Sequence, residues 1–208
     1  MKSPVPLFDS LNHLHKNADN AVLPEARFLK DFTHTLNFLK CYTGSLGTFN
    51  SYRREVERLL QWTWLIKHAT VTELKRDDIE QFVRFCQAPP QTWLGLKKVP
   101  RFVEQHGTRT PNTNWRPFVV SISKTSRSLG NEPSLEQFSL SQGAIQEIFA
   151  ILSTYFNFLI AEEYVFSNPV ALIRQKSKFV RKRQLSAPVR RLSSKQLQAV
   201  LHAADLLA

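Results

Sequence analysis

The chain has 208 residues and a formal net charge of +11 at pH 7, and 42% of its residues are hydrophobic, including 15 Phe and 4 Trp. This apolar content excludes wholesale disorder, because it suffices to build a core. No run approaches the ~20 apolar residues of a membrane span, and the N-terminus has no apolar signal core, so we expect a cytoplasmic protein. The two cysteines form no CxxC pair, so we expect no zinc site.

The positive charge is concentrated in two segments. Nine Lys or Arg and no Asp or Glu lie between Tyr164 and Ala204, and seven Lys or Arg lie between Lys97 and Asn131, with Glu104 as the single acid. Such a distribution indicates a surface that binds a polyanion, and nucleic acid is the usual partner. Neither segment has the amphipathic apolar face that inserts into a lipid surface, so we expect no membrane partner.

The first third of the chain predicts a flexible segment and two helices. Several Pro and Asn residues within 1–24 predict a flexible N-terminal segment. Apolar residues at helical spacing predict a first helix over 25–42. A second helix is expected to follow Thr48 as its N-cap and to continue to about Ile66, with one apolar and one charged face.

A shorter third helix and an insert follow. The helix is expected to run from Asp77 or Asp78 to Cys86, with its acids at the positive end of the helix dipole. We interpret these acids and Glu80 as a favourable helix start and not as a metal site. An irregular insert at about 89–133 comes next, and it is too long for an ordinary connection, so we expect it to have a function.

The longest helical pattern lies in the segment SLSQGAIQEIFAILSTYFNFLIAEEY. Ser139 together with Gln142 predicts a capping box at its start. The continuous apolar stripe predicts a central helix that is buried on most sides and is roughly 30 Å long.

The C-terminal part is predicted to be a linker and a short helix. An Asn-Pro turn at 168–169 leads into a basic linker at 174–192. A short amphipathic helix, capped by Ser193 or Ser194, then opens the segment 193–208.

Together these elements predict an all-α fold. We expect an orthogonal bundle of four to five helices over 25–173, interrupted by a long irregular insert and followed by a basic C-terminal linker. The aromatic residues Tyr52, Trp62 and Tyr155 are expected to lie in the core of this bundle rather than to stack on a ligand.

Four segments in chain order resemble a known family. The four segments are TFNSYRREVERLLQWTWL, VTELKRDDIEQFVRF, SQGAIQEIFAILSTYFNFLIAEEYVFSNP and APVRRLSSKQLQAVL. With these segments the chain is similar to the N-terminal core-binding, SAM-like domain of tyrosine recombinases, the phage integrase family. The insert segment NTNWRPFV resembles an insert of some integrases of mobile elements.

The resemblance implies a function in DNA integration and recombination of a bacterial mobile element. In this family the core-binding and catalytic domains form a clamp around duplex DNA, and a basic linker follows the backbone between them. The parent enzyme rejoins DNA through a covalent phosphotyrosine without a metal or cofactor, and it works as a tetramer. The segment 193–208 would open a catalytic domain that is missing here, so we expect duplex DNA and other protomers as partners but no catalytic residues in this chain.

The resemblance also suggests DNA-contacting residues. The starts of the second and fourth helices would face a major groove, and the basic segments would neutralise phosphates. For single residues, ordinary capping and a solvated face remain open alternatives, and Arg116 could equally anchor the insert with Trp115. The candidates are Thr48, Asn50, Ser51, Arg54, Arg116, Ser141, Gln142, Gln146, Arg174, Lys176, Lys178, Arg181, Lys182 and Arg183.

Two other functions are compatible with the same sequence. One is a helical nucleic-acid-binding regulator unrelated to recombination. The other is a protein-interaction helical bundle whose basic segments contact an acidic protein.

Overall fold

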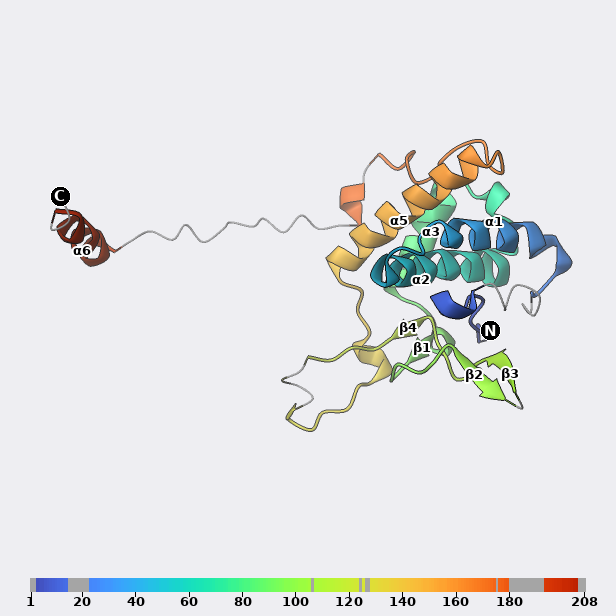
Figure 1. Ribbon diagram of the computed structural model, residues 1–208, viewed down its shortest axis with the longest axis horizontal. Coiled ribbons are helices and arrows are strands. Elements are labelled where there is room, and N and C mark those ends of the chain that lie inside the picture. Colours follow the sequence, from blue (N-terminus) through green and yellow to red (C-terminus); the bar gives the residue numbers. More distant parts are fainter. Residues whose placement is uncertain are drawn as a thin grey trace.

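The fold is mainly helical. A computed structural model describes residues 3–14, 23–105, 107–123, 125, 128–174, 176–179 and 193–205. The α-helices within these residues are α1 (Leu29–Lys40), α2 (Leu46–Trp62), α3 (Arg76–Gln87), α5 (Gln142–Ala161) and α6 (Ser194–Asp205). Each corresponds to a helix expected from the apolar spacing, and Figure 1 shows α1, α2, α3 and α5 together in one helical body.

The core lies between α1, α2 and α5. Helix α5 buries eight side chains, including Ile148, Leu152 and Tyr155, and it packs against both α1 and α2. Tyr155 and Trp62 are buried and Tyr52 packs at the edge of the core, which confirms the prediction that these aromatics are core residues.

Helix α5 also has the length and apolar composition of a membrane span, which the sequence reasoning did not expect. The mean hydropathy of its most apolar window is 1.4. A core helix that is buried among other helices has the same composition, so this feature does not by itself indicate a membrane.

The predicted N-caps of α2 and α5 were wrong. Ser45 caps α2, because its Oγ accepts a hydrogen bond from the Thr48 backbone N–H at 3.4 Å. Ser141 caps α5, and its Oγ accepts from the Ala144 N–H at 3.1 Å. Several Ser and Thr residues lie near each helix start. Only the backbone geometry decides which of them has non-helical φ and ψ angles and is therefore the N-cap.

The corrected cap of α5 gives a testable expectation. Replacing Ser141 by Ala is expected to lower the free energy of unfolding by about 1 kcal/mol, because the Ala144 N–H loses its partner. Replacing the exposed Ser139 by Ala is the matched control and should change it by less than about 0.5 kcal/mol. Urea unfolding of both variants measures the difference, and equal effects would contradict this cap assignment.

The insert contains four short strands among its described residues and is not irregular throughout, so the all-α prediction holds only in part. Strand β1 (Leu94–Gly95) pairs in parallel with β4 (Phe118–Val119), and β2 (Phe102–Gln105) pairs antiparallel with β3 (Thr108–Pro111). Such short strands leave too few residues for a two-residue periodicity to be visible in the sequence. Figure 1 shows this β unit as a layer below the helices.

Aromatic side chains fix the insert to the helical body. Trp93 and Phe118 are completely buried and belong to the same core cluster as the helices. Phe85 of α3 contacts both rings, with centroid distances of 4.9 Å to Trp93 and 6.4 Å to Phe118. The insert is therefore part of the same folded unit as the helices.

The N-terminal segment is not flexible over residues 3–14, contrary to the prediction. Phe8 is 1% exposed and stacks on Phe32 of α1 at 5.0 Å. The backbone of this segment is bound by α2, because the Leu7 N–H donates to Glu57 and the Gln61 amide donates to the Val5 carbonyl. Residues 15–22 lie outside the described residues.

The C-terminal boundary of the folded body also differs from the prediction. The linker was expected to begin at residue 174, but Phe179 is 6% exposed and its ring lies 5.8 Å from that of Phe149 in α5. Residues 180–192 lie outside the described residues. Helix α6 begins after Ser193, whose Oγ accepts from the Gln196 N–H at 3.3 Å, as predicted.

Candidate nucleic-acid interface

The starts of α2 and α5 lie on the same side of the helical body (Figure 1). An ion pair joins the third turn of α2 to the second turn of α5, in which Arg54 Nη2 lies 2.8 Å from Glu147 Oε2. The first turn of a helix has unpaired N–H groups and a partial positive charge, both of which favour anions. Two adjacent helix starts therefore form a surface suited to a phosphate backbone.

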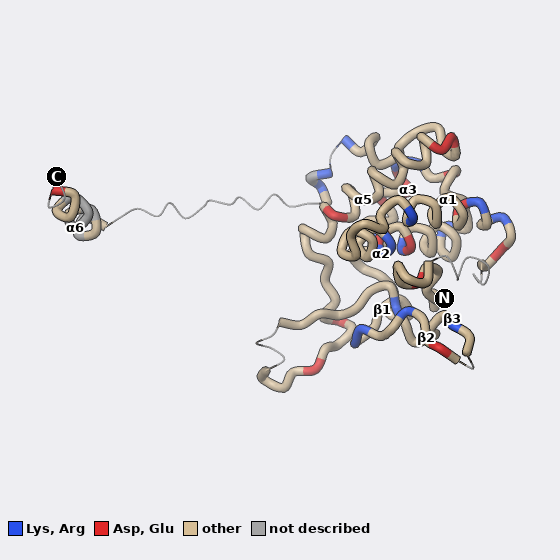
Figure 2. Tube along the Cα trace, in the orientation of Figure 1, with Lys and Arg blue, Asp and Glu red and all other residues tan. Residues whose placement is uncertain are grey.

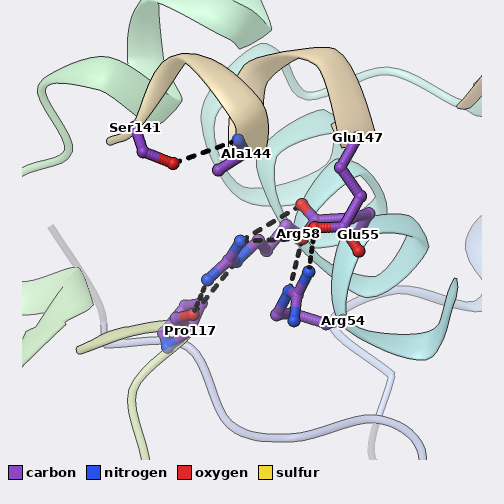
Figure 3. A network of polar contacts seen from close by, with 7 residues as sticks. All are labelled: Arg54, Glu55, Arg58, Pro117, Ser141, Ala144 and Glu147. Carbon is purple, nitrogen blue, oxygen red and sulfur yellow. Dashed lines mark hydrogen bonds and ion pairs between the residues drawn. The ribbon is translucent and has the colours of Figure 1, made fainter. Parts of the chain in front are cut away.

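A four-residue ionic network connects these helices to the insert (Figure 3). Glu55 is 2% exposed and pairs with both Arg54 and Arg58, and Glu147 pairs with Arg54. Arg58 also donates to the Pro117 carbonyl oxygen from Nε at 3.0 Å and from Nη2 at 2.6 Å. The network thus holds α2, α5 and the β1–β4 part of the insert in one arrangement.

The electrostatics of Arg54 follow from this network. Its partial burial lowers the pKa of Arg54, but the charges and hydrogen bonds of Glu55 and Glu147 outweigh burial and raise the pKa above its ordinary value. Arg54 stays fully charged, and its two carboxylate partners compensate that charge.

A groove of about 930 Å³ lies between α2, the start of α5 and the insert. Its described lining contains seven Lys or Arg and two Glu, which gives it a clear positive excess. Figure 2 shows basic positions along α2 and along the insert between β1 and β2. The basic residues are Arg53, Arg54, Arg58, Lys97, Lys98, Arg101 and Arg116.

Only some of these cations are free to bind an anion. Lys97 and Lys98 are exposed, and neither has a hydrogen bond or an ion pair within the described part of the chain. Arg116 is half-buried and donates to the carbonyl oxygens of Thr113 and Trp115, both at 2.7 Å, so its charge has no acidic partner among the described residues. These three residues supply the accessible positive charge of the groove.

The buried cations of the groove have a structural role. Arg53 donates to the Asp9 carbonyl oxygen and, at 2.8 Å, to Asn50 Oδ1, and burial lowers the pKa of Arg53 to about 10. Arg101 pairs with Glu57 and lies 4.4 Å over the Trp115 ring. Both arginines tie the N-terminal segment and the insert to α2.

Three of the fourteen predicted DNA-contacting residues line the groove: Asn50, Arg54 and Arg116. Five more do not line it and belong to the first two turns of α2 and α5 or to the cap of α5, namely Thr48, Ser51, Ser141, Gln142 and Gln146. Of the residues that line the groove, Arg54 is neutralised by its ion pairs. Asn50 serves first as a partner of Arg53.

The predicted basic linker at 174–192 is only partly described. Lys178 forms an ion pair with Glu80 of α3 at 2.6 Å, and Lys176 lies 5.6 Å over the Phe149 ring. Arg174 is exposed and lines a shallow depression of about 480 Å³ with Lys75 and Arg76 of the α3 start. This first part of the segment folds back on the body, which corrects the prediction that it is linker, and Arg181, Lys182 and Arg183 lie outside the described residues.

Sequence reasoning missed five basic residues of the groove: Arg53, Arg58, Lys97, Lys98 and Arg101. The basic excess after residue 97 was visible, but it did not show which of its residues face α2. The charges of α2 looked like an ordinary solvated face, since their acidic partners cannot be assigned without the fold.

The acids at the start of α3 are bound to groups at or near that helix start. Asp78 Oδ2 accepts from the Lys75 N–H at 2.9 Å, and Asp78 also pairs with Lys67 at 2.7 Å. Within the described ranges, no group of three or more His, Cys, Asp or Glu is placed to hold a metal ion. These acids therefore stabilise the helix start, as the sequence indicated.

Comparisons with known proteins give no relative for this chain. No family model, no curated protein and no solved structure matches it.

Proposed function

We propose that this chain binds duplex DNA as the core-binding part of a tyrosine recombinase that acts in DNA integration and recombination of a bacterial mobile element. The observation that carries the proposal is the groove beside the starts of α2 and α5, with its excess of Lys and Arg. The order of the four recombinase-like segments supports the same function, and the helices would form the orthogonal, SAM-like bundle of that family.

The geometry suggests how the surface would meet DNA. The starts of α2 and α5 would approach the major groove, where base edges carry a distinct pattern of donors and acceptors. Lys97, Lys98 and Arg116 would contact phosphates beside it and add affinity through counterion release. The exposed Arg174 would extend the phosphate contacts on the α3 side.

The chain would contribute DNA binding and not the cleaving nucleophile. The hydroxyl of the buried Tyr155 is hydrogen-bonded to Thr35 at 2.6 Å, and that of Tyr164 donates to Asp31 at 2.6 Å. Burial raises the pKa of both phenols well above the usual value, which opposes formation of a phenolate. Strand cleavage would belong to a catalytic domain of the parent, which would work with other protomers on DNA.

A salt series tests the proposal. Fluorescence anisotropy with a duplex of about 30 bp should show log affinity falling steeply with log salt. Replacing Lys97 and Lys98 by Ala should reduce the slope by roughly 0.9 for each phosphate that is no longer bound, and it should weaken binding to all duplexes alike.

The matched control replaces Lys30 and Lys40 of α1, which carry the same charge but do not line the groove. This variant should have a salt slope closer to that of the wild type than the Lys97 and Lys98 variant has. If the wild-type chain binds no duplex at low salt, the proposal fails, and an acidic protein becomes the partner to test. If both double variants reduce the slope by the same amount, binding does not use this groove.

A further inference from the structure

Arg54 is held by two carboxylates from two helices. Its Nε donates to Glu55 Oε1 on α2, and its Nη2 donates to Glu147 Oε2 on α5 at 2.8 Å (Figure 3). The side chain is still 39% exposed. Its Nη1 has no hydrogen-bond partner within the described residues, and it is not among the buried atoms that lack one. Arg54 is thus fixed in orientation while part of its guanidinium faces solvent.

The remaining donors of Arg54 have a defined arrangement. A guanidinium carries five N–H donors in a rigid plane, and Nε and Nη2 form one edge of it. The carboxylates occupy that edge, which leaves two Nη1 hydrogens and the second Nη2 hydrogen. One of these Nη1 hydrogens and the Nη2 hydrogen point in parallel from the end of the guanidinium. Two parallel donors are the pattern that matches O6 and N7 of guanine in the major groove.

The charge balance argues against a phosphate as the main ligand of this residue. Arg54 and Arg58 are offset by Glu55 and Glu147, so the network has no net charge. Affinity for phosphate depends on uncompensated charge, which Lys97 and Lys98 have and Arg54 lacks. What Arg54 retains is a fixed set of donors, and fixed donors discriminate between bases.

We propose that Arg54 reads a guanine in the major groove and that Glu147 is the positioning residue that orients its guanidinium. This inference rests on the proposed DNA binding and names the part of the surface that reads sequence. Glu147 lies 40% exposed on the same surface and would repel phosphates, so it lowers general affinity while it increases selectivity.

The experiment begins with the full 208-residue chain and a pool of duplexes of about 30 bp with a randomised centre, from which the preferred sequence is selected. Affinities of the wild type, Glu147→Ala, Glu147→Gln and Arg54→Lys are then measured for that duplex and for single base-pair changes of it. Arg54→Lys keeps the charge but loses the planar fork. Thermal melting of each variant checks that it is folded.

We expect the wild type to prefer a G·C pair at one position by about 10-fold or more, since a bidentate arginine contact discriminates by that order. Arg54→Lys and Glu147→Ala should each abolish most of this preference. Glu147→Gln should keep part of it, because the amide oxygen still accepts from Nη2. Both Glu147 variants should bind unrelated duplexes more tightly, with a salt slope steeper by roughly 0.9.

Lys97→Ala is the matched control, and it should weaken binding to every duplex equally and leave the base preference unchanged. If folded Arg54→Lys and Glu147→Ala weaken or strengthen all duplexes alike and retain the preference, the network is only a link between α2 and α5 and the inference is overturned, while DNA binding stands. If no duplex binds to the wild type, both the inference and the proposed function fail.

Discussion

Replacing Asp31 by Ala is expected to lower the free energy of unfolding by about 3 kcal/mol or more. Asp31 of α1 is completely buried and accepts three hydrogen bonds, from Trp64 Nε1 at 2.9 Å, the Val71 N–H at 3.0 Å and the Tyr164 hydroxyl at 2.6 Å. These donors come from three separate parts of the chain, and in the variant all three are without their acceptor. Urea unfolding at neutral pH measures the change.

Asp31→Asn is the matched control for this variant. The Asn oxygen can accept from Trp64 and Val71, and its amide can donate to the Tyr164 hydroxyl oxygen, so all three contacts persist. We therefore expect a change within about 1 kcal/mol. A destabilisation as large as that of Asp31→Ala would show that the negative charge, and not the acceptor geometry, is what the fold requires.

The free energy of unfolding should also depend on pH differently in the wild type and in Asp31→Asn. Burial raises the pKa of Asp31 above its ordinary value of 3.8, and the hydrogen bonds from Tyr164, Trp64 and Val71 reverse only part of that rise. Because the folded-state pKa is the higher one, the folded state binds more protons between the two values. The contribution of Asp31 to stability therefore increases as the pH falls through the raised pKa and levels off near 3.8. The wild type should gain stability relative to Asp31→Asn over that window, and a constant difference would contradict the raised pKa.

The helices could be predicted from the sequence because their signal is local. In α5 apolar residues recur at helical spacing over several turns, and Phe158 is only partly buried. The fully buried positions of this stripe are Ile145, Ile148, Phe149, Leu152, Phe156 and Leu159. The helix limits were less accurate, since Ser45 and Ser141 differ from their neighbours only in backbone conformation. Local patterns thus indicated the elements of the body but not their ends.

The insert and the N-terminal segment could not be predicted, because their order depends on distant partners. Pro4 and Pro6 suggested flexibility, whereas the burial of Phe8 depends on Phe32 and α2, which come later in the chain. Strands of two to four residues carry no measurable periodicity. These parts of the fold exist only once the helices provide a surface for them.

The sequence suggested some residues of the groove but not their ion pairs. Three of the suggested residues, Asn50, Arg54 and Arg116, line the groove, and five more belong to the first two turns of α2 and α5 or to the cap of α5. The sequence could not show that Arg54 is compensated by Glu147, 93 positions away, whereas Lys97 has no ion-pair partner among the described residues. That distinction separates residues expected to read bases from residues expected to bind phosphates.

Glu57 joins the N-terminal segment, α2 and the insert, and its replacement by Gln is the second large effect we expect. Glu57 is 1% exposed, accepts from the Leu7 N–H at 2.6 Å and pairs with Arg101, whose pKa is held well below its ordinary range by burial. Gln keeps the acceptor for Leu7 but leaves Arg101 as a buried, uncompensated charge. The free energy of unfolding should fall by about 3–5 kcal/mol.

The double variant Glu57→Gln with Arg101→Met tests the cause of this destabilisation. Removing the buried charge should restore most of the stability and leave a deficit of about 1–2 kcal/mol, because Arg101 no longer donates to the Phe8 carbonyl or stacks on Trp115. Urea unfolding of the two single variants and the double variant gives the coupling energy. A coupling near zero would contradict the pair as the origin of the effect. A large coupling would show that this buried pair holds the insert, and with it the Lys97 and Lys98 wall of the groove, against α2.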